Sequence, residues 1–341
     1  MESDRAGEHE AGAAPAGESG TPGDAGRGTT SAAGRDELQN EFSWSRSRVE
    51  QFEACRRRYY YNYYASWGGW EPAAPERTRR IYVLKQLKSR HVWAGIVVHD
   101  VVERVLKNLQ RGISLRSEEE AVAAALGRMR REFRESRSGR YWQRPKSLAL
   151  FEHEYETGIE DAAWKENADH VASCIRNFFQ SDVYDRLRSV PAGDFLEIET
   201  LSSFVVGGVK VWVKLDCCLE SGPGVFVIDW KTGRADRDRH AEQIASYALY
   251  AAQRWGAQPR QIQTLVYNLS IGEGQTYTMT EETVAQARQE IVDTAAAMRA
   301  YLADPAANVP LPEEAFELAP DERVCRWCNY RGVCPRFEAE P

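Results

Sequence analysis

The sequence predicts a mixed α/β fold in which a three-stranded meander is followed by a helix and a further strand. Apolar runs rich in β-branched residues occupy 195–206, 209–220 and 225–233, and glycine-containing turns separate them. A helical apolar pattern follows over 240–256, and another strand pattern covers 263–272. Helical patterns before the meander complete the set of elements expected of an α/β core.

The bulk composition is that of a globular chain. Its 341 residues allow one large domain. Its content of 43% hydrophobic and 28% charged residues is typical of a soluble protein. The net charge of -7 does not by itself indicate a nucleic-acid-binding protein, so the distribution of charge matters more. No apolar run approaches the roughly 20 residues that span a bilayer, and no secretory signal pattern opens the chain. Seven cysteines without an export signal favour a reducing compartment, so we expect a cytoplasmic protein.

The first 40 residues are predicted to be a disordered tail. Before Leu38 the chain holds no Val, Ile, Leu, Phe, Trp or Tyr, so it cannot bury enough apolar surface to offset the entropy of ordering. A tail that docks on a partner is the alternative. Residues 41–341 then form the expected ordered domain.

Helices are predicted on both sides of the meander. Ser47 with Glu50 fits a capping box, and the apolar stripe within 93–112 predicts a second helix. The charged and aromatic stretch from about 113 to 190 is mostly helical, within a helical insertion at about 66–190. A long helix near 283–302 leads to a cysteine-rich segment at 321–336.

The third predicted strand carries two opposite charges on one face. Asp229 and Lys231 are two residues apart, and a hairpin can bring Asp216, from the preceding strand, beside Asp229. Two carboxylates held together repel unless a cation or proton intervenes, and hard oxygen ligands suit Mg²⁺ or Mn²⁺. The lysine could orient a water or stabilise charge on a phosphoryl oxygen. The alternative is a plain ion pair, Asp229 with Lys231 or Asp216 with Lys214.

The order of these residues resembles a nuclease signature. Asp216, followed by Asp-Trp-Lys-Thr-Gly at 229–233, is similar to the PD-(D/E)xK motif of the RecB-like exonucleases. The next helix offers Gln243 and Tyr247, one turn apart, which match the QxxxY motif of that family. Upstream, Gly95 and His99 match its helical histidine motif.

This resemblance implies a restriction-endonuclease-like core and assigns roles to the matched residues. By this resemblance His99, Asp216 and Asp229 would bind the metal, and Lys231 would assist the attacking water. Gln243 and Tyr247 would contact DNA or steady the site. The resemblance therefore assigns catalysis to five residues: Asp216, Asp229, Lys231, Gln243 and Tyr247.

Two further residues qualify this assignment. Lys214 stands where the family often has a glycine, just before the metal-binding aspartate, and an extra cation there could alter metal affinity. Glu199, on the first predicted strand, is a candidate for an accessory acidic ligand.

The C-terminal segment carries a metal-type cysteine pattern. Cys325, Cys328 and Cys334 are spaced C-x₂-C-x₅-C, and Cys55 is the best fourth ligand. Thiolate-rich sites select zinc or an iron–sulfur cluster. The distant cysteine plus terminal triad resembles the [4Fe–4S] site of the iron–sulfur nucleases, including AddB and the CRISPR-associated RecB-like exonucleases. Such a cluster would join the two ends of the domain, and redox sensing is the alternative role. The alternative to a cluster is a set of unrelated buried cysteines. The remaining thiols are interpreted as core residues: Cys174, Cys217 and Cys218.

Basic residues gather in three stretches that could bind nucleic acid. The range 77–90 has six basic residues and no acidic one, and 128–146 has eight basic residues together with Tyr141 and Trp142. The range 56–61 is Arg-Arg-Arg-Tyr-Tyr-Tyr. Positive charge tracks phosphates and aromatic rings stack on bases, which suits single-stranded nucleic acid. Solvated helix faces are the alternative.

The sequence therefore predicts a metal-dependent DNA nuclease that hydrolyses phosphodiester bonds. Its exonuclease mode on single strands or ends comes from the family resemblance. DNA repair or recombination, CRISPR adaptation and phage defence are all compatible, and any helicase motor must be a separate partner because no GxxxxGK[ST] loop is present. One alternative is a catalytically silent nuclease fold that binds DNA or a protein. The other is a zinc-stabilised interaction protein.

Overall fold

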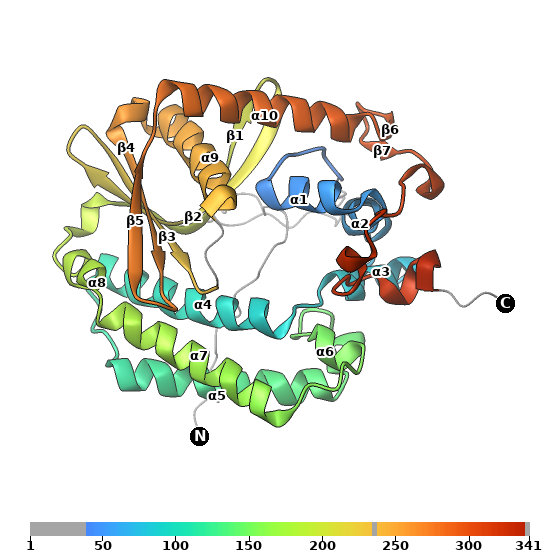
Figure 1. Cartoon of the computed structure of the whole chain (residues 1–341), viewed down its shortest axis with the longest axis horizontal. Helices are drawn as coiled ribbons and strands as arrows, with labels where there is room; N and C mark the ends of the chain where they lie inside the picture. The colour runs from blue at the N-terminus through green and yellow to red at the C-terminus, as the bar shows by residue number, and fades with distance from the viewer. Residues whose placement is uncertain (1–38, 234–236, 338–341) are drawn as a thin grey trace, which may run out of the picture. The chain divides into compact units, whose positions relative to one another are not determined.

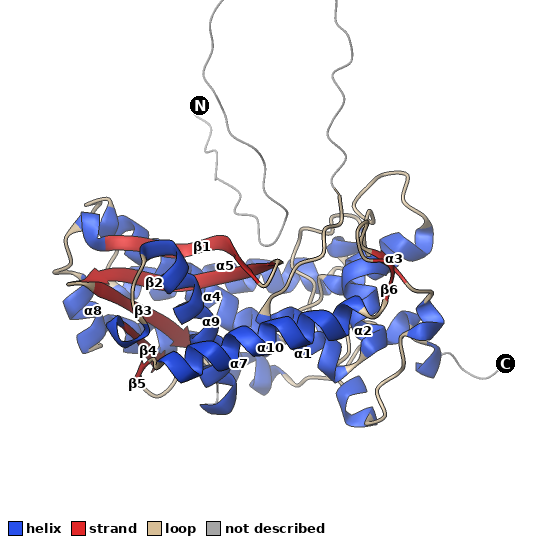
Figure 2. Cartoon of the chain, turned by 90° about the horizontal axis from the view of Figure 1, so that it is seen from above, coloured by secondary structure: helices blue, strands red, loops and turns tan. Residues whose placement is uncertain are grey.

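A five-stranded mixed sheet is the centre of the fold (Figures 1 and 2). The computed structural model describes residues 39–233 and 237–337, so nearly all of the expected tail lies outside the described residues. The sheet has the order β1-β2-β3-β4-β5. Neighbouring strands are antiparallel except β3 and β4, which are parallel. The strands are β1 (Phe195–Val206), β2 (Val209–Ser221), β3 (Gly224–Lys231), β4 (Ile262–Asn268) and β5 (Glu273–Thr278). The predicted mixed α/β class and its three-stranded meander are confirmed.

Glycines close the meander where side chains do not fit. Gly207 and Gly208 have φ of +55° and +74°, the left-handed conformation that a two-residue hairpin needs. A Cβ on Gly224 would lie 2.0 Å from the carbonyl oxygen of Gln261, because β4 begins beside the start of β3. The turns therefore fix the register that carries the acidic residues.

Helices cover both faces of the sheet. On one face, α9 (Arg237–Trp255) makes the crossover from β3 to β4 and packs against α10 (Glu281–Arg299). Its apolar side joins a core cluster with the inner residues of β2 and β3, and α1 (Arg46–Ala54) joins the same cluster. On the other face, α4 (Arg90–Gln110) and α7 (Asp161–Phe179) contribute to a second cluster.

Partway along β1, the even-numbered residues change from one face of the sheet to the other. Ile198 belongs to the cluster on the α4 side, whereas Phe204 belongs to the cluster on the α9 side. Regular alternation would place two even-numbered residues on the same face, so the strand must turn over between them. Glu199, with φ of +51°, supplies a conformation that interrupts the alternation.

The segment between the first helix and the meander is mostly helical, as the sequence predicts. A π-helical turn, Tyr61–Ala65, continues α2. The other helices are α2 (Arg56–Tyr60), α3 (Glu76–Lys85), α5 (Glu118–Arg137), α6 (Phe151–Glu154) and α8 (Asp182–Leu187). After α10 the chain forms a small hairpin, β6 (Leu302–Asp304) with β7 (Val309–Pro310), and then short 3₁₀ turns. Across the described ranges, no helix combines the length and apolarity needed to cross a membrane.

Two local expectations are corrected. The cap of α1 is Ser45, whose hydroxyl accepts from the Arg48 amide, and not Ser47. Strand β5 was not predicted, because its residues are almost all polar and exposed and show no apolar alternation. It is held by its ladder with β4 after a turn at Gly272.

Candidate active site and metal centre

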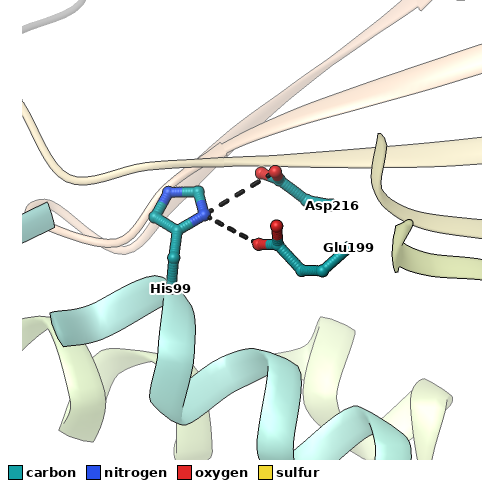
Figure 3. A group of neighbouring side chains, drawn as sticks. All are labelled: His99, Glu199 and Asp216. Atoms are coloured by element: carbon teal, nitrogen blue, oxygen red, sulfur yellow. Dashed lines mark hydrogen bonds and ion pairs between the residues drawn. The ribbon is translucent and has the colours of Figure 1, made fainter. Parts of the chain in front are cut away.

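A histidine and two carboxylates converge between α4 and the sheet (Figure 3). His99 Nδ1 lies 3.1 Å from Glu199 Oε1 and 3.6 Å from Asp216 Oδ1. Within the described residues, these three form the one His, Cys, Asp and Glu group whose ligand atoms all lie within 4.8 Å of one another. Imidazole and carboxylate donors in this arrangement can hold a divalent cation.

The sheet register brings three carboxylates into one row. Ile198 pairs with Cys217 and Thr200 with Leu215, so Glu199 stands opposite Asp216. On the other side of β2 the last pair is Cys217 with Ile228, which leaves Asp216 and Asp229 at the next position. Asp216 is also fixed by the Trp230 amide, which donates to its Oδ2 at 2.7 Å. The row runs across three adjacent strands and ends beneath α9.

Helix α4 approaches this row closely because it carries a glycine. Gly95 lies one turn before His99, on the same helix face. A Cβ on Gly95 would lie 3.2 Å from Thr232 Oγ1, a tight contact at the end of β3. The glycine therefore allows the helix that bears His99 to pack against the strand end that bears Lys231.

The carboxylates of Glu199, Asp216 and Asp229 concentrate negative charge in the protein interior. Burial opposes the protonation of His99, but Asp216, Glu199 and Asp229 outweigh it and raise its pKa to about 9. Burial raises the pKa of Asp216 to about 7, and the carboxylates of Asp229 and Glu199 add to this effect against His99. Carboxylates that share a site in this way favour a bound cation or proton.

The remaining predicted residues form a second, connected network beside the row. Lys231 Nζ lies 2.7 Å from Asp229 Oδ2 and donates to Gln243 Oε1 at 2.8 Å. Gln243 Nε2 donates to the Tyr247 hydroxyl, and that hydroxyl donates to Asp229 Oδ1 at 3.2 Å. Asp229 is only 2% exposed, and its Oδ2 is engaged by the Lys231 ammonium. The ion pair foreseen between Asp229 and Lys231 is therefore present, inside a larger network.

Glu199, the accessory candidate, lies in one group with two of the three predicted metal ligands. His99 and Asp216 stand together as expected, but Glu199, the accessory candidate, completes their group, whereas Asp229 faces Lys231 and Tyr247. Glu199 was hard to identify because its position depends on the interrupted alternation of β1. Lys214, the departure noted in the sequence, pairs with Glu199 Oε2 at 2.6 Å rather than with Asp216.

The four predicted cysteine ligands line one pocket. Cys55 stands between α1 and α2, and its partners Cys325, Cys328 and Cys334 come from the C-terminal turns. Arg336 donates to Cys325 Sγ at 3.2 Å, and Arg58 also lines the pocket. Burial raises the pKa of Cys328 to about 11, to which the neighbouring Cys55 and Cys334 contribute. The three other thiols are fully buried, as predicted: Cys174, Cys217 and Cys218.

Some residues of the basic stretches are buried or already paired, so they are not free to contact nucleic acid. Tyr141 is 3% exposed and donates to Glu154, so it cannot stack on a base in this conformation. Arg128 in the same stretch is paired with Glu132 and Asp100. In the stretch 56–61, Arg57 is buried and paired with Glu313 at 3.1 Å.

Comparison with known proteins identifies the family of this chain. A profile of the PD-(D/E)XK nuclease superfamily matches residues 43–335. A solved structure titled "Crystal structure of SSO0001" is similar at 20% sequence identity, covering 52% of this chain and 79% of that chain with a TM-score of 0.26. No curated protein matches this sequence. The family match spans both the row of carboxylates and the cysteine pocket, and the chain therefore belongs to the PD-(D/E)XK nuclease superfamily.

Proposed function

We propose that the protein is a metal-dependent deoxyribonuclease of the RecB-like branch of this superfamily. The observation that carries the proposal is the row of carboxylates from Glu199, Asp216 and Asp229, with His99 against one end and Lys231 at the other. Membership of the superfamily makes phosphodiester hydrolysis the expected chemistry.

The donors in the row fit Mg²⁺ or Mn²⁺. They are hard carboxylate oxygens with one imidazole, and the ligand atoms of His99, Glu199 and Asp216 all lie within 4.8 Å of one another. His99, Glu199 and Asp216 would hold the ion, and Asp229 adjoins them through its charge. When bound, the ion would act as a Lewis acid and lower the pKa of a coordinated water.

The chain itself supplies positioning and charge. Lys231 is held by Asp229 and Gln243, so its ammonium has a fixed place beside the carboxylates. From there it can orient a water or stabilise negative charge on a phosphoryl oxygen. Tyr247 joins Gln243 to Asp229 and limits the freedom of both side chains. Gln243 and Tyr247 are thus positioning residues in this proposal.

The cysteine pocket is proposed to hold a [4Fe–4S] cluster. Four thiols that line one pocket can hold zinc or an iron–sulfur cluster. The resemblance of one distant cysteine plus a terminal triad to the iron–sulfur nucleases favours the cluster. Iron and acid-labile sulfide in anaerobically purified protein, lost in Cys328→Ala, would support it, and stoichiometric zinc without iron would oppose it.

The mode of cleavage follows from the resemblance to the RecB-like exonucleases. We propose an exonuclease on single strands or ends, acting in DNA repair or recombination, CRISPR adaptation or phage defence, with any motor on a separate protein. End-labelled single- and double-stranded DNA, incubated with Mg²⁺ or Mn²⁺, gives the test. Products shortened progressively from one end support the exonuclease. Internal cuts would make it an endonuclease, and no cleavage would favour a silent nuclease fold that binds DNA or a protein.

A further inference from the structure

A cluster of three cations lies outside the metal centre, where α1 approaches the end of α3. It consists of Arg48 from α1, Lys85 at the end of α3 and Lys88 in the loop before α4. Two of the charges share the ring of Tyr63. The Arg48 guanidinium carbon is 4.2 Å from the ring centroid and Lys85 Nζ is 5.7 Å from it. We call this the Arg48–Lys85–Lys88 cluster.

Arg48 is buried among neutral groups. It is 3% exposed and donates to Ser43 Oγ at 3.1 Å, to the Tyr59 hydroxyl at 3.3 Å and to the Tyr64 hydroxyl at 3.4 Å. Its Nε is buried and makes no hydrogen bond within the described residues. The guanidinium is therefore solvated by hydroxyls and ring faces, with its charge left uncompensated.

The cluster as a whole lacks a counter-charge. Among the side chains of residues 39–233 and 242–337, no carboxylate lies within 4.0 Å of a charged nitrogen of Arg48, Lys85 or Lys88. The buried Arg57, by contrast, is paired with Glu313. Like charges that are removed from water and left unpaired are unfavourable, so a cluster of this kind needs an anion.

The lysines respond to this environment. Burial, with Arg48 and Lys88 adding to it, lowers the pKa of Lys85 to about 8. Burial alone lowers the pKa of Lys88. Lys85 thus carries the repulsion of both other cations, and an anion placed beside it would relieve both this repulsion and the cost of desolvation.

The cluster is rigidly placed with respect to the metal centre. The main chain of Lys88 bridges to the segment before α6, with its amide 2.8 Å from Ala149 O and its carbonyl accepting from Phe151 N at 2.9 Å. Ser89 then caps α4, and His99 lies about 15 Å further along that helix at 1.5 Å per residue. Figure 1 shows α3 beside the N-terminal end of α4 and the strands above its middle.

We propose that the Arg48–Lys85–Lys88 cluster binds a phosphate group of the nucleic-acid strand whose scissile phosphate lies at the metal centre. This inference rests on the proposed function and adds a second anchoring point to it. Arg48 offers a fixed charge, and the two ammonium groups offer mobile donors to phosphate oxygens. The separation along α4 means that the anchored phosphate belongs to another nucleotide of the strand rather than to the reacting one.

The first test measures oligonucleotide binding by the full chain with metal chelated, so that cleavage does not interfere. Affinity for a single-stranded DNA is followed against salt for wild type, Lys85→Met, Lys88→Met and Lys165→Met. Lys165 is an exposed lysine on α7 and controls for charge removal. Each cluster variant should bind the single strand more weakly, and its slope of log affinity against log salt should be smaller by about 0.7, whereas Lys165→Met keeps the wild-type slope. Equal slopes in Lys85→Met and wild type would overturn the proposal.

Thermal unfolding with inorganic pyrophosphate provides a readout that does not depend on DNA. Without anion, Lys85→Met should unfold at a higher temperature than wild type, because a like charge has been removed. Pyrophosphate should then raise the unfolding temperature of wild type more than that of the variant. A less stable variant with equal protection by pyrophosphate would contradict an anion site.

The two measurements also separate the possible sources of the anion. A wild type that is protected by pyrophosphate but does not bind the oligonucleotide would assign the cluster to a free phosphate and overturn the strand contact. A chain that binds DNA through the cluster but cleaves no substrate would refute the proposed nuclease function. It would keep the phosphate contact and overturn its link to a scissile phosphate at the metal centre.

Discussion

His99 on α4 and Glu199 on β1 meet at 3.1 Å although they are far apart in the sequence. Glu199 reaches this place because its backbone leaves the regular strand conformation at φ of +51°. Non-glycine residues rarely adopt this conformation, and when they do, the strain often marks a functional site.

Removing the Glu199 charge should weaken metal binding. Glu199→Gln keeps the size of the side chain but takes one anionic ligand from the group of His99, Glu199 and Asp216. We expect the affinity for Mn²⁺, measured by calorimetry, to fall by at least about tenfold, since ligand charge sets affinity in such sites. Glu197→Gln, two residues earlier and bonded to Tyr250, is the control and should retain wild-type affinity.

The backbone at Glu199 predicts an order of stabilities. A left-handed residue with a Cβ costs about 1 kcal/mol relative to glycine. Glu199→Gly should therefore unfold at higher urea concentration than Glu199→Ala, with a difference of about 1 kcal/mol in the free energy of unfolding. Equal stabilities would mean that the strand relaxes when the carboxylate is lost.

The close approach of α4 predicts an activity defect without a folding defect. Gly95→Ala gains helix propensity of about 1 kcal/mol but crowds Thr232 Oγ1, so its stability should stay near wild type while DNA cleavage falls. Thr232→Ala removes the obstructing oxygen and should restore cleavage in the double variant. Gly127→Ala in α5 meets no atom within 4 Å and should stabilise the protein with unchanged cleavage. Additive losses in the double variant would count against the packing explanation.

The depressed pKa of Lys85 predicts a pH dependence of stability. The charged groups that lower it are Arg48 and Lys88, after burial itself. Below pH 8 the folded protein bears the full cost of the buried charge. Above pH 8 the folded form releases the proton while the unfolded chain keeps it up to about 10.5, so stability rises in that window.

Urea unfolding of wild type and Lys85→Met between pH 7 and 10.5 measures this effect. The stability of wild type relative to the variant should increase through the window, and the pair of wild type and Lys165→Met should show no such rise. A pH-independent difference in the free energy of unfolding between wild type and Lys85→Met would show that the lysine is fully solvated.

The sequence predicts the parts of this fold that depend on local pattern. The meander follows from β-branched runs between glycine turns, and the crossover helix follows from its apolar stripe. Strand β5 was missed because its partner β4, rather than its own residues, makes it a strand. The cap at Ser45 was missed because Ser47 offered an equally good local pattern two residues later.

The site was less predictable because it depends on tertiary structure. Asp216, Asp229 and Lys231 share short-range spacing, so they could be grouped from the sequence. Glu199 ranked lower because regular alternation would turn it away from the α4 side, and its left-handed backbone marks the place where β1 departs from that alternation. The Arg48–Lys85–Lys88 cluster combines α1 with the end of α3 and the loop that follows it, so its lack of carboxylate partners appears only in three dimensions.

Cleavage of end-labelled DNA by anaerobically purified wild type and Lys231→Ala, with Mg²⁺ or Mn²⁺, tests the central claim most directly. Lys231 should be needed because Asp229 and Gln243 hold its ammonium beside the acidic row. The account predicts metal-dependent cleavage by wild type that falls by at least about a hundredfold in the variant, the range typical of a residue that stabilises transition-state charge. Equal cleavage by the two proteins, or none by a folded wild type, would contradict it.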